Sequence, residues 1–252
     1  MNSIELSKHL DQLLDPEKIS DVSCNGLQIP SEISISKIAV ATDASMEVFE
    51  EAKAKGCNFI FVHHGIFWNF NKESNISLKQ KEKLRFLFDN EISLYASHLP
   101  LDIHPIYGNN KSLFDLLKLQ KLEKMGNFHG LQLGLMGDLE NSMSFENFTQ
   151  FVEQQLNDKV KAYLFNDQDV QKVALITGQG QDGLFEAQEK GFDTFITGEM
   201  NHYMYHVAKE SNINLILAGH YRTETLGPKA IGQYLNKKFS FDIEFLEFPT
   251  GL

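Results

Sequence analysis

The segment Lys37–His64, KIAVATDASMEVFEEAKAKGCNFIFVHH, decides the fold, because it contains a strand, a helix and a second strand in succession. Its apolar runs, IAVA at Ile38–Ala41 and FIFV at Phe59–Val62, are typical of buried strands. Thr42 or Asp43 can cap the helix between them. A strand, a helix and a strand joined by short loops predict a mainly parallel sheet with flanking helices.

A similar segment recurs later in the chain. Lys172–Glu199, KVALITGQGQDGLFEAQEKGFDTFITGE, aligns with the first segment without a gap and shares seven of 28 residues. Each copy continues into another strand, ISLYASHLPLD or INLILAGHYRTE, in which a histidine and an acid recur. Seven identities alone could arise by chance, but the shared order of elements favours an internal duplication. We therefore expect one α/β domain over residues 1–252, built from two similar lobes, about 1–120 and about 121–252, with a site between them.

Other elements follow from the same periodicities. Helices are expected from Ser3, over LKQKEKLRFLFD, near Asn109–Lys118 and from Ser144, where apolar residues recur at helical spacing. Strands are expected at Ile92–Ala96 and over LQLGLMG. Both lobes thus alternate strands and helices.

Composition limits the classes of function. The chain has 252 residues, 42% of them hydrophobic, and a net charge of −11 without a long basic run, which argues against an extended nucleic-acid surface. Its apolar runs are too short to cross a membrane, and its first residues lack the apolar region of a signal peptide. Two cysteines form no disulfide framework or four-cysteine zinc site. We expect a cytoplasmic protein.

Polar residues cluster where the predicted strands end. Ligands of open α/β sheets bind beyond the carboxyl ends of the strands. Imidazoles and carboxylates are also the usual protein ligands of zinc, manganese and iron. Such residues are His63, His64, His98 and Asp102 in the first lobe, and Glu199, His220 and Glu224 in the second. They exceed what one catalytic zinc usually takes from a protein, so a site for two metal ions fits better.

Two of these residues have open roles. A single histidine after a strand is more often a hydrogen-bonded structural residue than a ligand, so His98 can be either a direct ligand or support for one. Glu199 can be a base near a metal-bound water or simply a carboxylate at a strand end.

Two further patterns compete with this interpretation. In GEMNHYMYH, His202 and His206 share one helical face, but the chain lacks the partner helices of a di-iron bundle and the His-Glu-x-x-His motif of zincins. These histidines are expected to line the approach to the site or to pack between the lobes. TGQGQDG, at Thr177–Gly183, resembles a phosphate-binding loop but lacks its full motif, which favours a tight turn.

The motifs HHGIFW, SHLPLD, YGNN, TGE and GHYRTET resemble the signatures of the Nif-three-like proteins, which are also called dinuclear metal-centre proteins or GTP cyclohydrolase I type 2 homologues. The resemblance covers almost the whole chain, from about Asn25 to the C-terminus. It implies two α/β lobes with the site between them, in the short form without an inserted domain, and assembly into a toroidal homohexamer.

The resemblance also implies a ligand set. Position by position, the metal ligands become His63, His64, Asp102, His220 and Glu224, and they hold two divalent ions. The ligands do not distinguish zinc, iron and manganese. A metal-dependent hydrolase acting on a small, nucleotide-like substrate is the first functional hypothesis, with His98 or Glu199 moving a proton or supporting a ligand. A metal-binding or partner-binding protein without turnover is the alternative.

Overall fold

The computed structural model describes residues 1–68, 76–128 and 130–252, and the chain divides into two compact units. Unit 1 comprises Met1–Tyr107 and Gly227–Phe248, and unit 2 comprises Gly108–Leu226 and Pro249–Leu252. The units are thus not the two continuous halves expected from the sequence. The reason is that the last strand of the chain hydrogen-bonds to a strand near its beginning.

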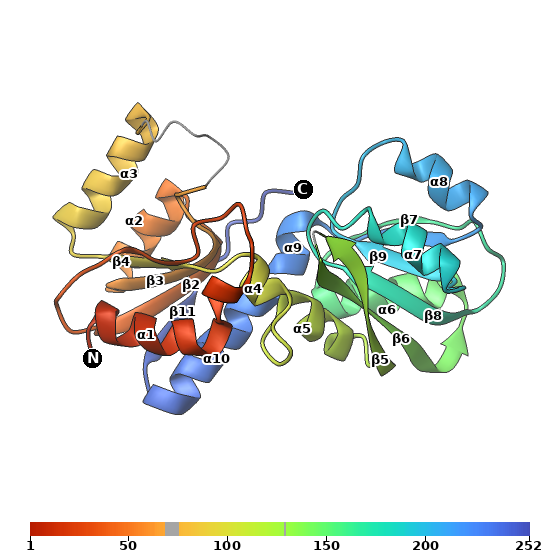
Figure 1. The fold of residues 1–252 in the computed structure, drawn as a ribbon, viewed down its shortest axis with the longest axis horizontal. Helices are drawn as coiled ribbons and strands as arrows, with labels where there is room; N and C mark the ends of the chain where they lie inside the picture. The colour runs from red at the N-terminus through yellow and green to blue at the C-terminus, as the bar shows by residue number, and fades with distance from the viewer. Residues whose placement is uncertain (69–75, 129) are drawn as a thin grey trace. The chain divides into compact units, whose positions relative to one another are not determined.

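Unit 1 is built on a five-stranded sheet with the order β1-β4-β3-β2-β11 (Figure 1). Strands β2, β3, β4 and β11 are parallel, and β1 is antiparallel to β4. The expected mainly parallel sheet is confirmed here. The strands are β1 (Gly26–Ile29), β2 (Lys37–Asp43), β3 (Phe59–His64), β4 (Ser93–Ala96) and β11 (Asp242–Phe245).

Helices cover both faces of this sheet, because successive side chains of each strand point to opposite faces. On one face, the strand residues Ile60 and Val62 pack in one cluster with Val48 of α2 and Leu87 of α3. On the other, Phe59 and its neighbours pack with residues of α1 and α10. The helices are α1 (Ser3–Leu14), the 3-10 helix η1 (Pro16–Lys18), α2 (Met46–Ala54), α3 (Leu78–Asp89), α4 (Leu99–Asp102) and α10 (Leu226–Phe239), whose first residue belongs to unit 2.

Unit 2 contains a six-stranded sheet with the order β5-β6-β8-β9-β10-β7. Only β8, β9 and β10 are parallel to one another, and antiparallel strands extend the sheet at both sides, so this sheet is mixed. The strands are β5 (Gln120–Phe128), β6 (Leu131–Met143), β7 (Lys161–Tyr163), β8 (Val170–Ile176), β9 (Thr194–Thr197) and β10 (Asn214–Leu217).

The second sheet is also covered on both faces. Phe148 and Val152 of α6 pack in one cluster with residues of α5 and of the central strands, whereas Leu184 of α7 and Met204 of α8 belong to a second cluster. The helices are α5 (Asn109–Leu116), α6 (Phe145–Leu156), α7 (Gly183–Glu189), α8 (Met204–Glu210) and α9 (His220–Glu224). The whole is a mixed α/β fold of two sheets with flanking helices.

The two similar segments adopt the same strand register. Ile38 pairs with Phe59 in unit 1, and the aligned Val173 pairs with Thr194 in unit 2. Each unit therefore contains a strand, helix, strand, helix, strand succession in which the first two strands meet at equivalent residues. This likeness is what a duplication would produce, and the duplication itself stays a prediction.

The start of α2 differs from the sequence-based prediction. Strand β2 continues through Thr42 and Asp43, so neither residue can cap the helix. Ser45 is the cap, and its side chain accepts a hydrogen bond from the backbone N–H of Val48. The carboxylate of Asp43 is engaged elsewhere, as described below.

Within the described part of the chain, no helix combines the length and apolar character needed to cross a membrane.

Candidate metal centre

His63 and His64 are the last two residues of β3. The His63 side chain is fully buried, and that of His64 is 20% exposed. Gly65 follows them, and its missing side chain lets neighbouring residues approach closely, since a Cβ atom on it would lie 2.3 Å from the side chain of Gln28 and 2.6 Å from Cβ of Ala96. The two imidazole rings have centroids 4.5 Å apart.

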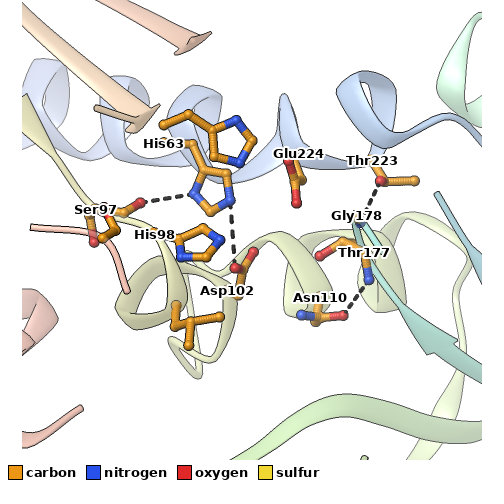
Figure 2. Close-up of polar contacts among 12 residues, drawn as sticks. His63, Ser97, His98, Asp102, Asn110, Thr177, Gly178, Thr223 and Glu224 are labelled. Carbon is orange, nitrogen blue, oxygen red and sulfur yellow. Dashed lines mark hydrogen bonds and ion pairs between the residues drawn. The ribbon is translucent and has the colours of Figure 1, made fainter. Parts of the chain in front are cut away.

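In unit 1, the ring nitrogen Nδ1 of each of three histidines contacts an oxygen atom of another residue. For His63 this is the carbonyl oxygen of Ser97, at 2.8 Å, as Figure 2 shows. His64 and His98 instead contact carboxylates: Asp43 at 2.8 Å and Asp21 at 2.9 Å. An oxygen that accepts a hydrogen bond from Nδ1 keeps the proton on Nδ1. The lone pair of the neutral ring is then on Nε2. Metal-binding histidines typically have this arrangement.

The three rings lie close together. Ring centroids are 5.2 Å apart for His63 and His98, and 5.6 Å apart for His64 and His98. One donor atom from each of the three lies within 4.8 Å of the others, so these residues can hold a metal ion. Asp102, in α4, adds a carboxylate that is 7% exposed, with Oδ2 3.5 Å from Nε2 of His63 (Figure 2).

Asp21 is a central residue of this region that the sequence analysis missed. Its side chain is only 1% exposed. It accepts hydrogen bonds from Nδ1 of His98, the backbone N–H groups of Ser23 and Leu99, and the amide of Asn25. Burial acts to raise the pKa of Asp21, but the hydrogen bond and charge of His98, with the other donors, outweigh it and lower this pKa to about 2. Asp21 therefore stays ionised.

In unit 2, the predicted residues Glu199, His220 and Glu224 form one hydrogen-bonded set. His220 begins α9, and its Nδ1 lies 2.9 Å from Oε1 of Glu199. Its Nε2 lies 3.0 Å from Oε2 of Glu224, one helical turn later. Glu224 is 4% exposed. Burial lowers the pKa of His220, but its contacts with Glu224 and Glu199 outweigh this effect and raise the pKa to about 9. The carboxylates of Glu199 and Glu224 therefore strongly favour a positive charge at this position.

The turn after β8 completes the surroundings of Glu224. Gly178 has φ of +63°, and a Cβ atom on it would lie 2.1 Å from Oε1 of Glu224 and 3.4 Å from Nε2 of His220. Its backbone N–H donates to Oγ1 of Thr223 at 3.0 Å, and the preceding N–H, of Thr177, donates to Asn110 at 2.9 Å (Figure 2). The segment Thr177–Gly183 is thus a tight turn, as expected, and its glycine leaves room for the carboxylate.

The histidine pair of GEMNHYMYH does not belong to this set. His202 and His206 are exposed, and their ring centroids are 6.1 Å apart at the start of α8. They belong to none of the groups of potential metal ligands found among the described residues. Their expected place along the approach to the site stays a prediction.

The chain matches a model of the family described as Duf34/NIF3 (NGG1p interacting factor 3) over residues 1–250. This chain belongs to the Duf34/NIF3 family. The expected family resemblance is thereby confirmed over nearly the whole length.

Curated relatives of this Duf34/NIF3 protein are similar over the full chain. A GTP cyclohydrolase 1 type 2 homolog of Pyrococcus abyssi is 36% identical over 253 residues, with 100% of both chains covered. A protein of the same name from Haemophilus influenzae is 36% identical, with 99% of both chains covered.

Solved structures show the same fold. A structural genomics protein, ybgI, described as of unknown function, matches with a TM-score of 0.93 and 32% identity over 100% of both chains. The protein TTHA1606 from Thermus thermophilus matches with a TM-score of 0.90 and 34% identity, again over 100% of both chains.

The donors of this Duf34/NIF3 protein fit a transition metal. Unit 1 offers three imidazoles whose Nδ1 atoms are held by oxygen, and unit 2 offers an imidazole between two carboxylates. Gly178 keeps the space beside Glu224 that a side chain would fill. These groups can orient and bind a divalent cation, and they include none of the nucleophilic serine or cysteine arrangements used in covalent hydrolysis.

Proposed function

We propose that this protein binds two divalent metal ions and hydrolyses a bond of a small, nucleotide-like substrate. The proposed ligands are His63, His64, Asp102, His220 and Glu224. The observation that carries the proposal is the anchoring of the histidines: Nδ1 of His63, His64 and His220 each meets an oxygen within 2.9 Å. Anchored imidazoles are the usual partners of a functional metal ion, and a purely structural surface histidine does not need such support.

The protein's own groups would do the following work. Ser97 and Asp43 hold the two β3 histidines so that both present Nε2, and Glu199 does the same for His220. Asp102 and Glu224 are buried carboxylates that would supply oxygen ligands to the ions. Divalent ions in such sites polarise the bond under attack and acidify water. Glu199, whose side chain is 41% exposed, would accept a proton from the attacking water.

The names of the curated relatives supply the substrate class. GTP cyclohydrolase 1 type 2 homolog denotes a nucleotide-directed activity, and we extend it to this chain as part of the proposal. The net charge of −11 suits such a substrate only if cations meet its phosphates, which bound metal ions would provide.

Elemental analysis and a substrate screen test the proposal. Protein purified without chelator and then reloaded should contain about two ions per chain. The loaded protein should turn over at least one member of a panel of nucleotides, phosphoesters and cyclic amides, and Glu224→Ala should abolish that turnover. A metal content that stays at or below one ion contradicts the two-metal centre. Two ions without turnover across the panel would instead favour a metal-binding protein that is not an enzyme.

A further inference from the structure

Unit 1 contains an acidic cavity formed by the end of α1, the 3-10 helix η1 and the beginning of β1. Its volume is about 730 Å³, within the range of about 300–1,000 Å³ that is usual for sites of small organic ligands. None of the described residues that line it is basic. Four are acidic: Asp11, Asp15, Glu17 and Asp21. The cavity therefore favours a positively charged ligand.

The carboxylates of this cavity differ in how strongly the protein already engages them. Asp21 is fully used by the four donors described above. Asp11 accepts a hydrogen bond from the hydroxyl of Tyr95 on Oδ1, at 2.8 Å, and no described residue donates to its Oδ2. Asp15 pairs with Lys18, whose side chain is 80% exposed, so a cationic ligand can replace this pair at little cost. Asp11 and Asp15 are thus able to accept new partners.

A buried hydroxyl in the wall of the cavity also indicates a ligand. Ser23 is 4% exposed and lines the cavity. Its backbone N–H donates to Asp21, but its Oγ forms no hydrogen bond with the described residues. A buried hydroxyl without a partner is unfavourable, and an N–H group of a bound molecule would satisfy it.

The distribution of the carboxylates argues against a metal ion in this cavity. Among the described residues, the groups of potential metal ligands whose donor atoms lie within 4.8 Å of one another include none of these four acids. Ile19 and Leu27, both half-buried, also line the cavity. Hard divalent ions need a compact shell of oxygen atoms and gain nothing from apolar walls. A long organic cation can meet both the separated charges and the apolar surface.

We propose that this cavity binds an aliphatic polyamine, in which ammonium groups are separated by methylene chains. Asp11, Asp15 and Glu17 pair with the ammonium groups, and the apolar side chains contact the methylenes. Ser23 accepts a hydrogen bond from one of the N–H groups. This site is additional to the proposed metal-dependent hydrolysis, and neither depends on the other.

Calorimetric titration of the full-length protein with spermidine tests the proposal. One molecule per chain should bind, and its affinity should fall as salt is added. The double variant Asp11→Asn, Asp15→Asn should bind about tenfold more weakly or worse, because charge-assisted hydrogen bonds are lost. Glu50→Gln, at an exposed position of α2 outside the cavity, removes the same type of charge and should leave the affinity unchanged.

Ser23→Ala separates binding from folding. Affinity for spermidine should fall about two- to tenfold, since one hydrogen bond to the ligand is lost. The urea midpoint of the ligand-free protein should stay the same or rise, because the hydroxyl has no partner to lose. Unchanged affinity in this variant would overturn the site, and the result remains readable if the double variant at Asp11 and Asp15 does not fold.

Further outcomes would assign the binding elsewhere and overturn the proposal. Equal weakening by Glu50→Gln would mean general attraction to a chain of net charge −11. Binding that disappears when metal is removed with a chelator would place spermidine at a metal ion. A trilysine peptide that binds more tightly than spermidine would indicate a basic segment of a protein partner, and Mg²⁺ that displaces spermidine readily at matched ionic strength would indicate a metal site. The absence of any binding would also overturn it, and none of these results bears on whether the protein is a hydrolase.

Discussion

Glu199 holds Nδ1 of His220 at 2.9 Å, although the two residues are 21 positions apart and follow different strands of the same sheet, β9 and β10. The aligned position in unit 1 is His64, so equivalent positions of the two similar segments carry different groups. In unit 2 the residue at this position, Glu199, supports a histidine. In unit 1 the residue at this position, His64, is itself a candidate ligand.

Replacing Glu199 by Leu tests this support. The change removes the acceptor on Nδ1, so metal affinity should fall ten- to a hundredfold. In metal-free protein the pKa of His220, raised to about 9 by Glu224 and Glu199, should move downward. Chelator competition measures the first effect and an NMR titration of the imidazole measures the second. A His220 pKa unchanged by the substitution would contradict the role assigned to Glu199.

Gly178→Ala should damage metal binding more than stability. A Cβ atom at Gly178 would displace the carboxylate of Glu224, which is the end of a flexible side chain and can move away. The positive φ of +63° adds strain of about 1 kcal/mol or somewhat more. Gly191→Ala is the matched control, because its φ is +70° and a Cβ atom there would meet nothing within 4 Å.

Both glycine variants should therefore lose similar stability in denaturant unfolding, and only Gly178→Ala should lose metal affinity. Equal metal affinity in the two variants would mean that the space beside Glu224 is not needed for binding.

Asp21→Asn should make the metal-free protein less stable at neutral pH. A depression of the Asp21 pKa from 3.8 to about 2 corresponds to about 2 kcal/mol. Because the folded-state pKa is the lower one, this stabilisation is complete above the unfolded-state value and is lost as the pH falls from about 4 towards 2. Urea unfolding at several pH values should show wild type and variant converging in acid.

Asp15→Asn is the control for that experiment. Asp15 forms an ion pair with Lys18 whose side chain is 80% exposed, and exposed pairs of this kind contribute little. Asn also tolerates the left-handed backbone of this position, where φ is 49°. A constant difference between Asp21→Asn and wild type down to pH 2 would argue that hydrogen-bond geometry, and not ionisation, accounts for the effect.

The expected homohexamer should be visible in solution. Light scattering with size-exclusion chromatography should give about six times the chain mass of 28.7 kDa. The outer edge of β5 in the sheet of unit 2 offers backbone groups that association could cover. A monomer at micromolar concentration would remove this expectation without touching the metal-binding proposal.

Local sequence patterns were sufficient to predict much of the fold. The apolar runs of Lys37–His64 and of its second copy predicted strands β2, β3, β8 and β9 with the helices between them, because burial on two faces leaves a readable signal in consecutive residues. The antiparallel pair β5 and β6 was only half predicted. Most residues of β5 are exposed, so the strand lacks that apolar signal.

The sequence by itself determined which imidazoles and carboxylates lie at or shortly after the ends of the strands, since strand ends and short spacings are local properties. Tertiary structure decided what holds them. Asp21 reaches His98 across 77 positions, and β11 joins β2 across nearly the whole chain. Such partners depend on how loops return to the sheet, and no periodicity records that. The orientation of each histidine, and therefore its donor nitrogen, follows from these distant hydrogen bonds and not from its neighbours in sequence.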